Sequence, residues 1–245
     1  FPKFVSHEIE LAGGKITLTG FAKGAGMICP NMATMIALVL CDVKIGTEEW
    51  QGLFIRAVGK SFNRATVDGD TSTNDTLYGL ANGVSGVEVT AKDIPLLEQS
   101  LVDLLKKLAY MLVQDGEGAT KVMHIKVRGA KRDAEAELIA RTVGHSPLVK
   151  TAMYGKDANW GRIVAAVGRS GANFDPAKVR VSICGVEVFA NEQPTNCDFD
   201  ALLKEPLQGR DIEILITVGE EHGRYSLMAS DLTHEYVSIN ADYRS

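Results

Sequence analysis

Thr34 stands where a flexible loop meets a mostly apolar run. Gly24, Gly26 and Pro30 precede it, and residues 35–43 are long and apolar enough to form a buried strand. A threonine hydroxyl is a weak nucleophile, and one way to activate it is to make the residue N-terminal, so that its own α-amine accepts the proton. An α-amine titrates near roughly 7.7–8.0 and a lysine amine near roughly 10.4, so the free amino terminus is the better base around pH 7.

This chemistry would require the peptide bond between Ala33 and Thr34 to be broken. The alternative is that Thr34 is an ordinary strand residue, because threonine is common in strands. The spacing alone favours this second interpretation.

Glu117 is a second candidate functional residue. It lies in the run Asp-Gly-Glu-Gly at 115–118, between a leucine-rich helical pattern and an apolar strand pattern. A carboxylate held there by a glycine turn can receive an amino group, although an acid at this place can also be a plain solvated loop charge. The residues leave both interpretations open.

Residues 63–74 are dense in Asp, Thr, Ser and Asn. Ordinary turn chemistry explains this composition, and the pattern fails as an EF-hand because it lacks the required glycine and the closing glutamate. The five histidines show no metal-ligand spacing. We therefore predict no metal and no bound cofactor. The scattered cysteines, without CxxC spacing, are typical of a reducing compartment, and we expect a cytoplasmic protein.

The composition of the chain limits the classes of partner that it can bind. The chain has 245 residues, 45% apolar and 23% charged, which is ordinary for a soluble globular protein large enough to bury a sizeable core. The net charge of −5 and the lack of a basic stripe argue against nucleic acid, and no apolar run is long enough to span a bilayer. A small metabolite is the expected partner.

The periodic patterns predict an α/β (α+β) protein. A hairpin is expected over 7–21, and the strand over 35–43 is apolar on both faces, which is typical of a strand inside a layered structure. Helices and hairpins from about residue 123 indicate a second, smaller α+β domain, so we place domains at 1–122 and 123–245. Further elements are expected as helices over 47–58, 93–112 and 131–142, a strand over 122–127, and hairpins over 179–190 and 212–230.

Five segments together resemble the ornithine acetyltransferases, also called glutamate N-acetyltransferases. The resemblance runs in order over nearly the whole chain and is highly specific. The segments are Lys-Gly-Ala-Gly-Met at 23–27, Pro-Asn-Met-Ala-Thr-Met at 30–35, Val-Asp-Gly-Asp-Thr-Ser-Thr-Asn-Asp-Thr at 67–76, Asp-Gly-Glu-Gly-Ala-Thr-Lys at 115–121, and Ile-Asn-Ala-Asp-Tyr-Arg-Ser at 239–245.

The resemblance implies a layered αββα sandwich of the N-terminal-nucleophile type. It also implies a precursor that cuts itself between Ala33 and Thr34 into α and β chains that stay together, in α2β2 assemblies. Residues 1–33 would be the end of the α chain and 34–245 the β chain. Similar proteins carry well over a hundred further residues upstream, including the Thr-Gly pair that supplies the oxyanion donors. We expect that N-terminal part of the sandwich to be missing from this sequence.

The resemblance further implies a ping-pong acyl transfer in arginine biosynthesis. Thr34 would take the acetyl group from N-acetylornithine, releasing ornithine, and glutamate would then take it to give N-acetylglutamate. Lys23 matches the family lysine that contacts substrate and can pair with an α-carboxylate. Glu117 matches the substrate-binding glutamate, a partner for the ornithine side-chain ammonium. Asn240 and Ser245 match a C-terminal pair lining the substrate site; without the resemblance they would be dismissed as a disordered tail.

Three questions stay open. The sequence does not decide whether acetyl-CoA is also a donor. A related β-peptidyl aminopeptidase, which hydrolyses short peptides with a nucleophile that is typically serine, is an alternative that Thr34, Lys23 and the C-terminal tail oppose. A non-catalytic binding module with an uncut Ala33–Thr34 bond is a third possibility.

Overall fold

The computed structural model describes residues 1–30 and 35–242, and they form two compact units. The first unit contains residues 1–65 and 69–115, and the second contains residues 66–68 and 116–245. The sequence patterns placed the boundary after residue 122, whereas the units divide after Asp115. Within the described ranges, no helix is long and apolar enough to cross a membrane.

The first unit is built on a four-stranded sheet in the order β1-β2-β3-β5. The hairpin predicted over 7–21 is confirmed, because β1 and β2 pair antiparallel around Gly13 and Gly14. The predicted strand over 35–43 is present as β3, which pairs antiparallel with β2 and parallel with β5. The strands are β1 (Lys3–Leu11), β2 (Gly14–Lys23), β3 (Ile36–Cys41) and β5 (Thr76–Ala81).

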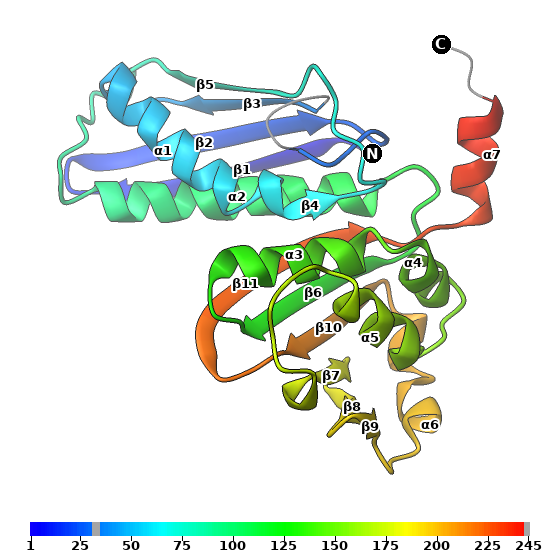
Figure 1. Ribbon diagram of the computed structural model, residues 1–245. Coiled ribbons are helices and arrows are strands. Elements are labelled where there is room, and N and C mark those ends of the chain that lie inside the picture. The colour runs from blue at the N-terminus through cyan, green and yellow to red at the C-terminus, as the bar shows by residue number, and fades with distance from the viewer. Residues whose placement is uncertain (31–34, 243–245) are drawn as a thin grey trace. The chain divides into compact units, whose positions relative to one another are not determined.

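Two helices cover one face of this sheet (Figure 1), namely α1 (Thr47–Gly59) and α2 (Ile94–Gln114), with a short 3-10 turn at Phe62–Arg64. The leucine stripe of α2 packs on β1 and β2 because the glycine at position 20 leaves room for it. A Cβ at Gly20 would lie 2.5 Å from Leu104 and 2.8 Å from Leu108, which is closer than side-chain atoms approach. Leu18, Val39 and Leu104 are fully buried in the resulting core.

On the opposite face of the sheet, apolar side chains gather over β3 and β5 and no described helix of this unit covers them, whereas the β1–β2 side of that face also carries Ser6, Glu8 and Thr19. Cross-strand neighbours line up there as a continuous row of Phe4, Phe21, Leu38 and Tyr78. The rings of Phe4 and Phe21 lie 5.0 Å apart, yet the three aromatic residues are 41–60% exposed. We call this surface, with Ile36, Leu40 and Leu80, the outer apolar face. These residues form a contiguous apolar patch, whereas the exposed apolar residues that are normal on a protein surface are scattered singly.

In the described part of the chain, the second unit carries a seven-stranded mixed sheet in the order β4-β11-β6-β10-β7-β8-β9. The hairpin predicted over 212–230 is wrong. Both strands exist, but β6 lies between them, parallel to β10 and antiparallel to β11. The strands are β4 (Ala65–Thr66), β6 (Val122–Gly129), β7 (Arg180–Ile183), β8 (Val186–Ala190), β9 (Gln193–Pro194), β10 (Asp211–Thr217) and β11 (Glu221–Ser230).

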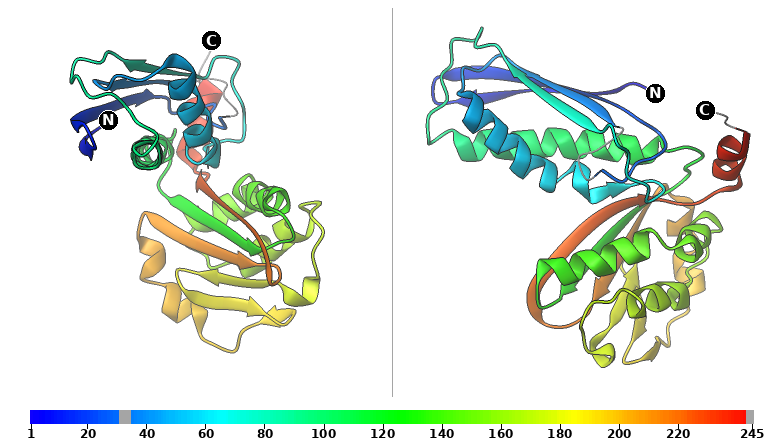
Figure 2. Two further views of the ribbon diagram at one scale, coloured as in Figure 1. Left: turned by 90° about the vertical axis from the view of Figure 1, so that its left-hand side faces the viewer. Right: turned by 45° about the horizontal axis from the view of Figure 1, so that its top comes forward.

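Helices α3, α4 and α5 gather on one face of this sheet (Figure 2), over a core of alternating residues such as Ile125, Val127 and Ile214. The opposite face is polar: His124 Nε2 lies 2.7 Å from Asp211, and Arg128 donates to Thr217 at 3.0 Å. The helices are α3 (Asp133–Gly144), α4 (Pro147–Tyr154), α5 (Trp160–Gly168), α6 (Phe199–Leu203) and α7 (His234–Asp242), with 3-10 turns at Pro176–Lys178 and Pro206–Gln208.

Lys150 of α4 is a buried cation inside the second unit. Its ammonium donates to the carbonyl oxygens of Val67 at 2.5 Å and Ser230 at 2.7 Å, and to the Ser230 hydroxyl at 3.3 Å. These bonds tie residues 66–68 to the end of β11. Burial lowers the pKa of Lys150 from 10.5 to about 8, because the charged form loses hydration.

The pKa of Lys150 predicts a pH-dependent stability. Between pH 8 and about 10 the unfolded chain keeps a proton that the folded chain releases, so the contribution of Lys150 to the free energy of unfolding rises with pH. The rise is at most about 3 kcal/mol. We expect the difference in unfolding free energy between wild type and Lys150→Met to grow over this range, as measured by urea unfolding. A constant difference would contradict the lowered pKa.

Candidate active site

Lys23 is the last residue of β2, and its side chain lies on the outer apolar face. It follows Phe21 by two positions, so the two side chains share a face, and its cross-strand neighbour is Ile36. The lysine is exposed. Its ammonium therefore stands at one end of an apolar surface, where it is available to a carboxylate.

The polar run at 67–76 holds the chain on both sides of the predicted nucleophile. Thr71 Oγ1 donates to the Cys29 carbonyl oxygen at 2.9 Å, ahead of residues 31–34. After them, the buried Asp75 carboxylate accepts the N–H of Met35, and Thr76 donates its N–H to the Met35 carbonyl oxygen at 2.7 Å. Sequence patterns assign no role to Thr71 or Asp75, because a turn-forming composition does not reveal which groups the side chains will contact. Ala33 and Thr34 lie outside the described residues.

Glu117 and Asn240 meet in the second unit although 123 positions separate them in the chain. Glu117 lies on the loop between α2 and β6, and Asn240 lies on α7. Asn240 Nδ2 donates to Glu117 Oε2 at 2.9 Å, and also to the Tyr236 carbonyl oxygen at 3.0 Å. The sequence patterns missed helix α7, whose residues show no apolar stripe. Ser245, the other predicted C-terminal site residue, lies outside the described residues.

The pair can bind a cation. The neutral amide of Asn240 orients the Glu117 carboxylate without cancelling its charge, so the pair remains negative. Glu117 is half-buried and still reachable from solvent. A carboxylate fixed in this way is suited to an ammonium group. In the ranges that the structure describes, no three His, Cys, Asp or Glu side chains gather as a metal site would require.

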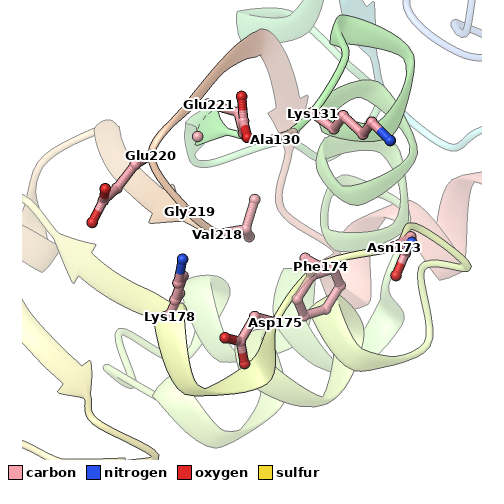
Figure 3. Close-up of a pocket in the computed structure, with 11 residues that line it drawn as sticks. Ala130, Lys131, Asn173, Phe174, Asp175, Lys178, Val218, Gly219, Glu220 and Glu221 are labelled. Carbon is pink, nitrogen blue, oxygen red and sulfur yellow. The ribbon is translucent and has the colours of Figure 1, made fainter.

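A separate cavity of about 400 Å³ lies at the other end of β6 and β11 (Figure 3). Lys178 and Asp175 face it from one side, and Glu220 and Glu221 from the other. Glu117 precedes the start of β6, whereas this cavity adjoins the end of β6 at Gly129. Neither Glu117 nor Asn240 lines the cavity. The charged side chains that line the cavity carry both signs. Among the described residues, they do not form a recognisable ligand-binding site.

The fold defines the chain as a mixed α/β protein with two sheets, in which Glu117 and Asn240 form an anionic, amide-supported pair. The model of the ArgJ family matches residues 1–245. The chain belongs to the ArgJ family.

Curated relatives match the whole of this chain. One, from Nitratidesulfovibrio vulgaris, is named arginine biosynthesis bifunctional protein ArgJ; it is 65% identical over 245 residues, which are 100% of this chain and 62% of the relative. Another, from Schizosaccharomyces pombe, has the same name with the word mitochondrial; it is 41% identical over 254 residues, covering 100% of this chain and 57% of the relative. The chain thus spans about three fifths of the length of these relatives.

A solved structure is also similar. It is a crystal structure of the arginine biosynthesis bifunctional protein ArgJ from Bacillus halodurans, with a TM-score of 0.79 and 34% sequence identity. The match covers 84% of this chain and 98% of the solved chain.

Proposed function

We propose that this chain is part of a glutamate N-acetyltransferase (ornithine acetyltransferase) that moves acetyl from N-acetylornithine to glutamate in arginine biosynthesis. The observation that carries the proposal is the bond between Asn240 and Glu117, at 2.9 Å. It joins two positions that the family resemblance assigns independently to one substrate site. The match of the family model to residues 1–245 supports the same activity.

The reaction has two acyl-transfer steps. The Thr34 hydroxyl oxygen attacks the acetyl carbonyl of N-acetylornithine while its proton passes to the Thr34 α-amine; the carbon–nitrogen bond breaks, and ornithine leaves with a proton. The α-amine of glutamate then attacks the acetyl-threonine ester. The carbon–oxygen bond breaks, Thr34 regains its proton, and N-acetylglutamate leaves. Two steps of low barrier replace one of high barrier.

The binding residues divide the substrate between them. We assign Lys23 to the α-carboxylate that N-acetylornithine and glutamate share, because a lysine ammonium is a compact positive charge. Glu117 receives the side-chain ammonium of the ornithine moiety, and Asn240 holds the Glu117 carboxylate in place. Ser245 is assigned to the same site by the family resemblance alone.

Cleavage between Ala33 and Thr34 would leave the 212 residues from 34 to 245. The length of the solved relative supports this cut. Its match covers 84% of this chain, or about 206 residues, and 98% of the solved chain, which is therefore about 210 residues long. A solved chain of that length is close to the expected β chain and much shorter than the full relatives.

The outer apolar face supports the finer fold, an αββα sandwich. An upstream segment of the precursor would supply a second sheet over Phe21 and Leu40, enclose Lys23, and bring the oxyanion donors. The relative from Nitratidesulfovibrio vulgaris has about 150 residues beyond the matched stretch, enough for such a layer.

An α2β2 assembly and a cytoplasmic location complete the proposal, although the fungal relatives are named mitochondrial.

A charge on the outer apolar face tests the sandwich. In the full-length precursor we expect Leu40→Glu to lower the thermal unfolding midpoint by several degrees and to reduce cleavage, because the carboxylate would be buried without a partner. Thr217→Glu, on the polar face of the second sheet next to Arg128, serves as the control and should leave both unchanged. Equal behaviour of the two variants would contradict a covered face.

Intact mass and acetyl transfer test the proposed function together. The full-length precursor should yield a fragment of about 23 kDa that begins at Thr34, scaled from the 26.4 kDa chain. The cleaved protein should transfer acetyl from N-acetylornithine to glutamate and should not release amino acids from short peptides. Acetyl-CoA, offered as donor in a parallel assay, decides whether this protein shares the second activity that the name bifunctional implies for its relatives. Cleaved protein without transfer would refute the proposal.

A further inference from the structure

The loop that carries Glu117 and the helix that carries Asn240 are joined by a ring of hydrogen bonds. Thr233 Oγ1 donates to the Gly118 carbonyl oxygen at 2.8 Å and accepts the Tyr236 N–H at 3.1 Å. The Tyr236 carbonyl oxygen accepts from Asn240, and Asn240 donates to Glu117. The ring therefore closes through Thr233, the buried residue directly before α7.

Thr233 acts on both partners through a single hydroxyl. By accepting the N–H three positions ahead, it satisfies one of the donors that a helix N-terminus leaves open, and so defines where α7 begins. By donating to Gly118, it fixes the backbone next to Glu117. The Thr233 hydroxyl therefore fixes the position of the start of α7 relative to the Glu117 loop.

The close approach depends on glycine at position 118. Gly118 has φ of +65°, in the left-handed region that favours glycine. A Cβ there would lie 2.5 Å from the Tyr236 nitrogen and 2.8 Å from Thr233 Oγ1. No other residue type allows the loop to lie this near to α7.

Asp231 anchors the other end of the same loop. Its buried carboxylate accepts the N–H groups of Thr120 at 2.8 Å and Lys121 at 3.0 Å, and the Thr120 hydroxyl at 2.5 Å. Lys121 is itself buried and donates to the carbonyl oxygens of the 207–209 turn. The loop between α2 and β6 is thus held from Asp231 and from Thr233, two residues apart at the end of β11.

We propose that Thr233 and Asp231 are positioning residues for the substrate ammonium. They set the distance between the Glu117 carboxylate and Asn240, and neither needs to touch the substrate. This inference rests on the proposed function, in which Glu117 binds the ornithine ammonium. Since glutamate has no side-chain ammonium, both residues should affect the ornithine side of the reaction selectively.

The test uses the full-length, cleaved enzyme. We expect Thr233→Val and Asp231→Ala each to raise the KM for N-acetylornithine about tenfold, as loss of one well-placed hydrogen-bonded contact does, while the KM for glutamate changes less than twofold. The dissociation constant of ornithine, measured by calorimetry, should rise by a similar factor. Thr233→Ser keeps the hydroxyl and should restore wild-type values. A variant that merely unfolds in part would lower kcat and leave both KM values unchanged.

Matched controls and a double variant complete the design. Asp133 accepts the Arg224 N–H at 2.8 Å at the opposite end of β11, and Thr142 donates only within its own helix; Asp133→Ala and Thr142→Val should leave KM unchanged. If Thr233 acts through Glu117, Thr233→Val should add nothing to the KM of Glu117→Ala.

The two proposals fail in different ways. No transfer by the wild-type enzyme would refute the proposed function, and an unchanged KM in Glu117→Ala would refute the binding role of Glu117; either result would also refute the inference that rests on them. A raised KM in Glu117→Ala with wild-type values in both Thr233→Val and Asp231→Ala would overturn only the positioning role. Additive effects in the double variant would also overturn it.

Discussion

Thr34→Ala in the full-length precursor should abolish both chain cleavage and acetyl transfer. The substitution removes the hydroxyl that would attack the Ala33 carbonyl during cleavage and the acetyl carbonyl during catalysis. Loss of a nucleophile reduces kcat by at least about 1,000-fold in comparable acyl-transfer enzymes. Intact mass should show a single uncut chain, and the transfer assay should show no acetyl-threonine.

A matched threonine and a hydroxyl-retaining variant sharpen this test. Thr142→Ala, on the exposed side of α3, should leave cleavage and transfer at wild-type levels. Thr34→Ser keeps a hydroxyl in place and should retain part of both activities. Transfer that survives in Thr34→Ala would sink the proposed mechanism, because the mechanism assigns the acyl group to the Thr34 hydroxyl alone.

Glu117→Ala should raise the KM for N-acetylornithine by about 10- to 150-fold. Removing a charge-assisted contact costs about 1.5–3 kcal/mol, and each 1.4 kcal/mol corresponds to a factor of ten. The Asn240 amide would also lose the acceptor that it contacts at 2.9 Å. The KM for glutamate should change much less, because this substrate brings no ammonium on its side chain. Steady-state kinetics with each substrate varied in turn will measure both constants.

Glu235→Ala is the control for Glu117→Ala. Glu235 is an exposed acid in the first turn of α7, so its removal changes the net charge equally without touching the Glu117–Asn240 pair. We expect wild-type KM values from it. An unchanged KM for N-acetylornithine in Glu117→Ala would show that the carboxylate binds no substrate ammonium, whatever its contact with Asn240.

Local patterns in the sequence predicted most of the elements. Alternation and helical spacing located the first hairpin, the long leucine-rich helix and the strand after Glu117, because these elements each bury one face. The motifs around Thr34 and Glu117 indicated the family before any geometry was known, and the family model confirms that identification over the whole chain.

Periodicity does not choose the partner of a strand. The predicted hairpin over 212–230 failed because β6, almost ninety residues earlier in the chain, supplies hydrogen-bond ladders to both β10 and β11. Alternation reports only which face is buried, whereas pairing depends on the backbone groups of distant segments.

The sequence by itself determined the residue types of the proposed site: a threonine after a glycine-rich loop, a lysine, a loop glutamate and an asparagine near the C-terminus. Only the tertiary structure decided that Glu117 and Asn240 touch, because it placed Asn240 on a helix where no apolar stripe predicts one. That helix begins where the Thr233 hydroxyl accepts the Tyr236 N–H and holds the Glu117 loop. Hydrogen bonds between residues more than a hundred positions apart leave no periodic signal, so only the folded chain reveals them.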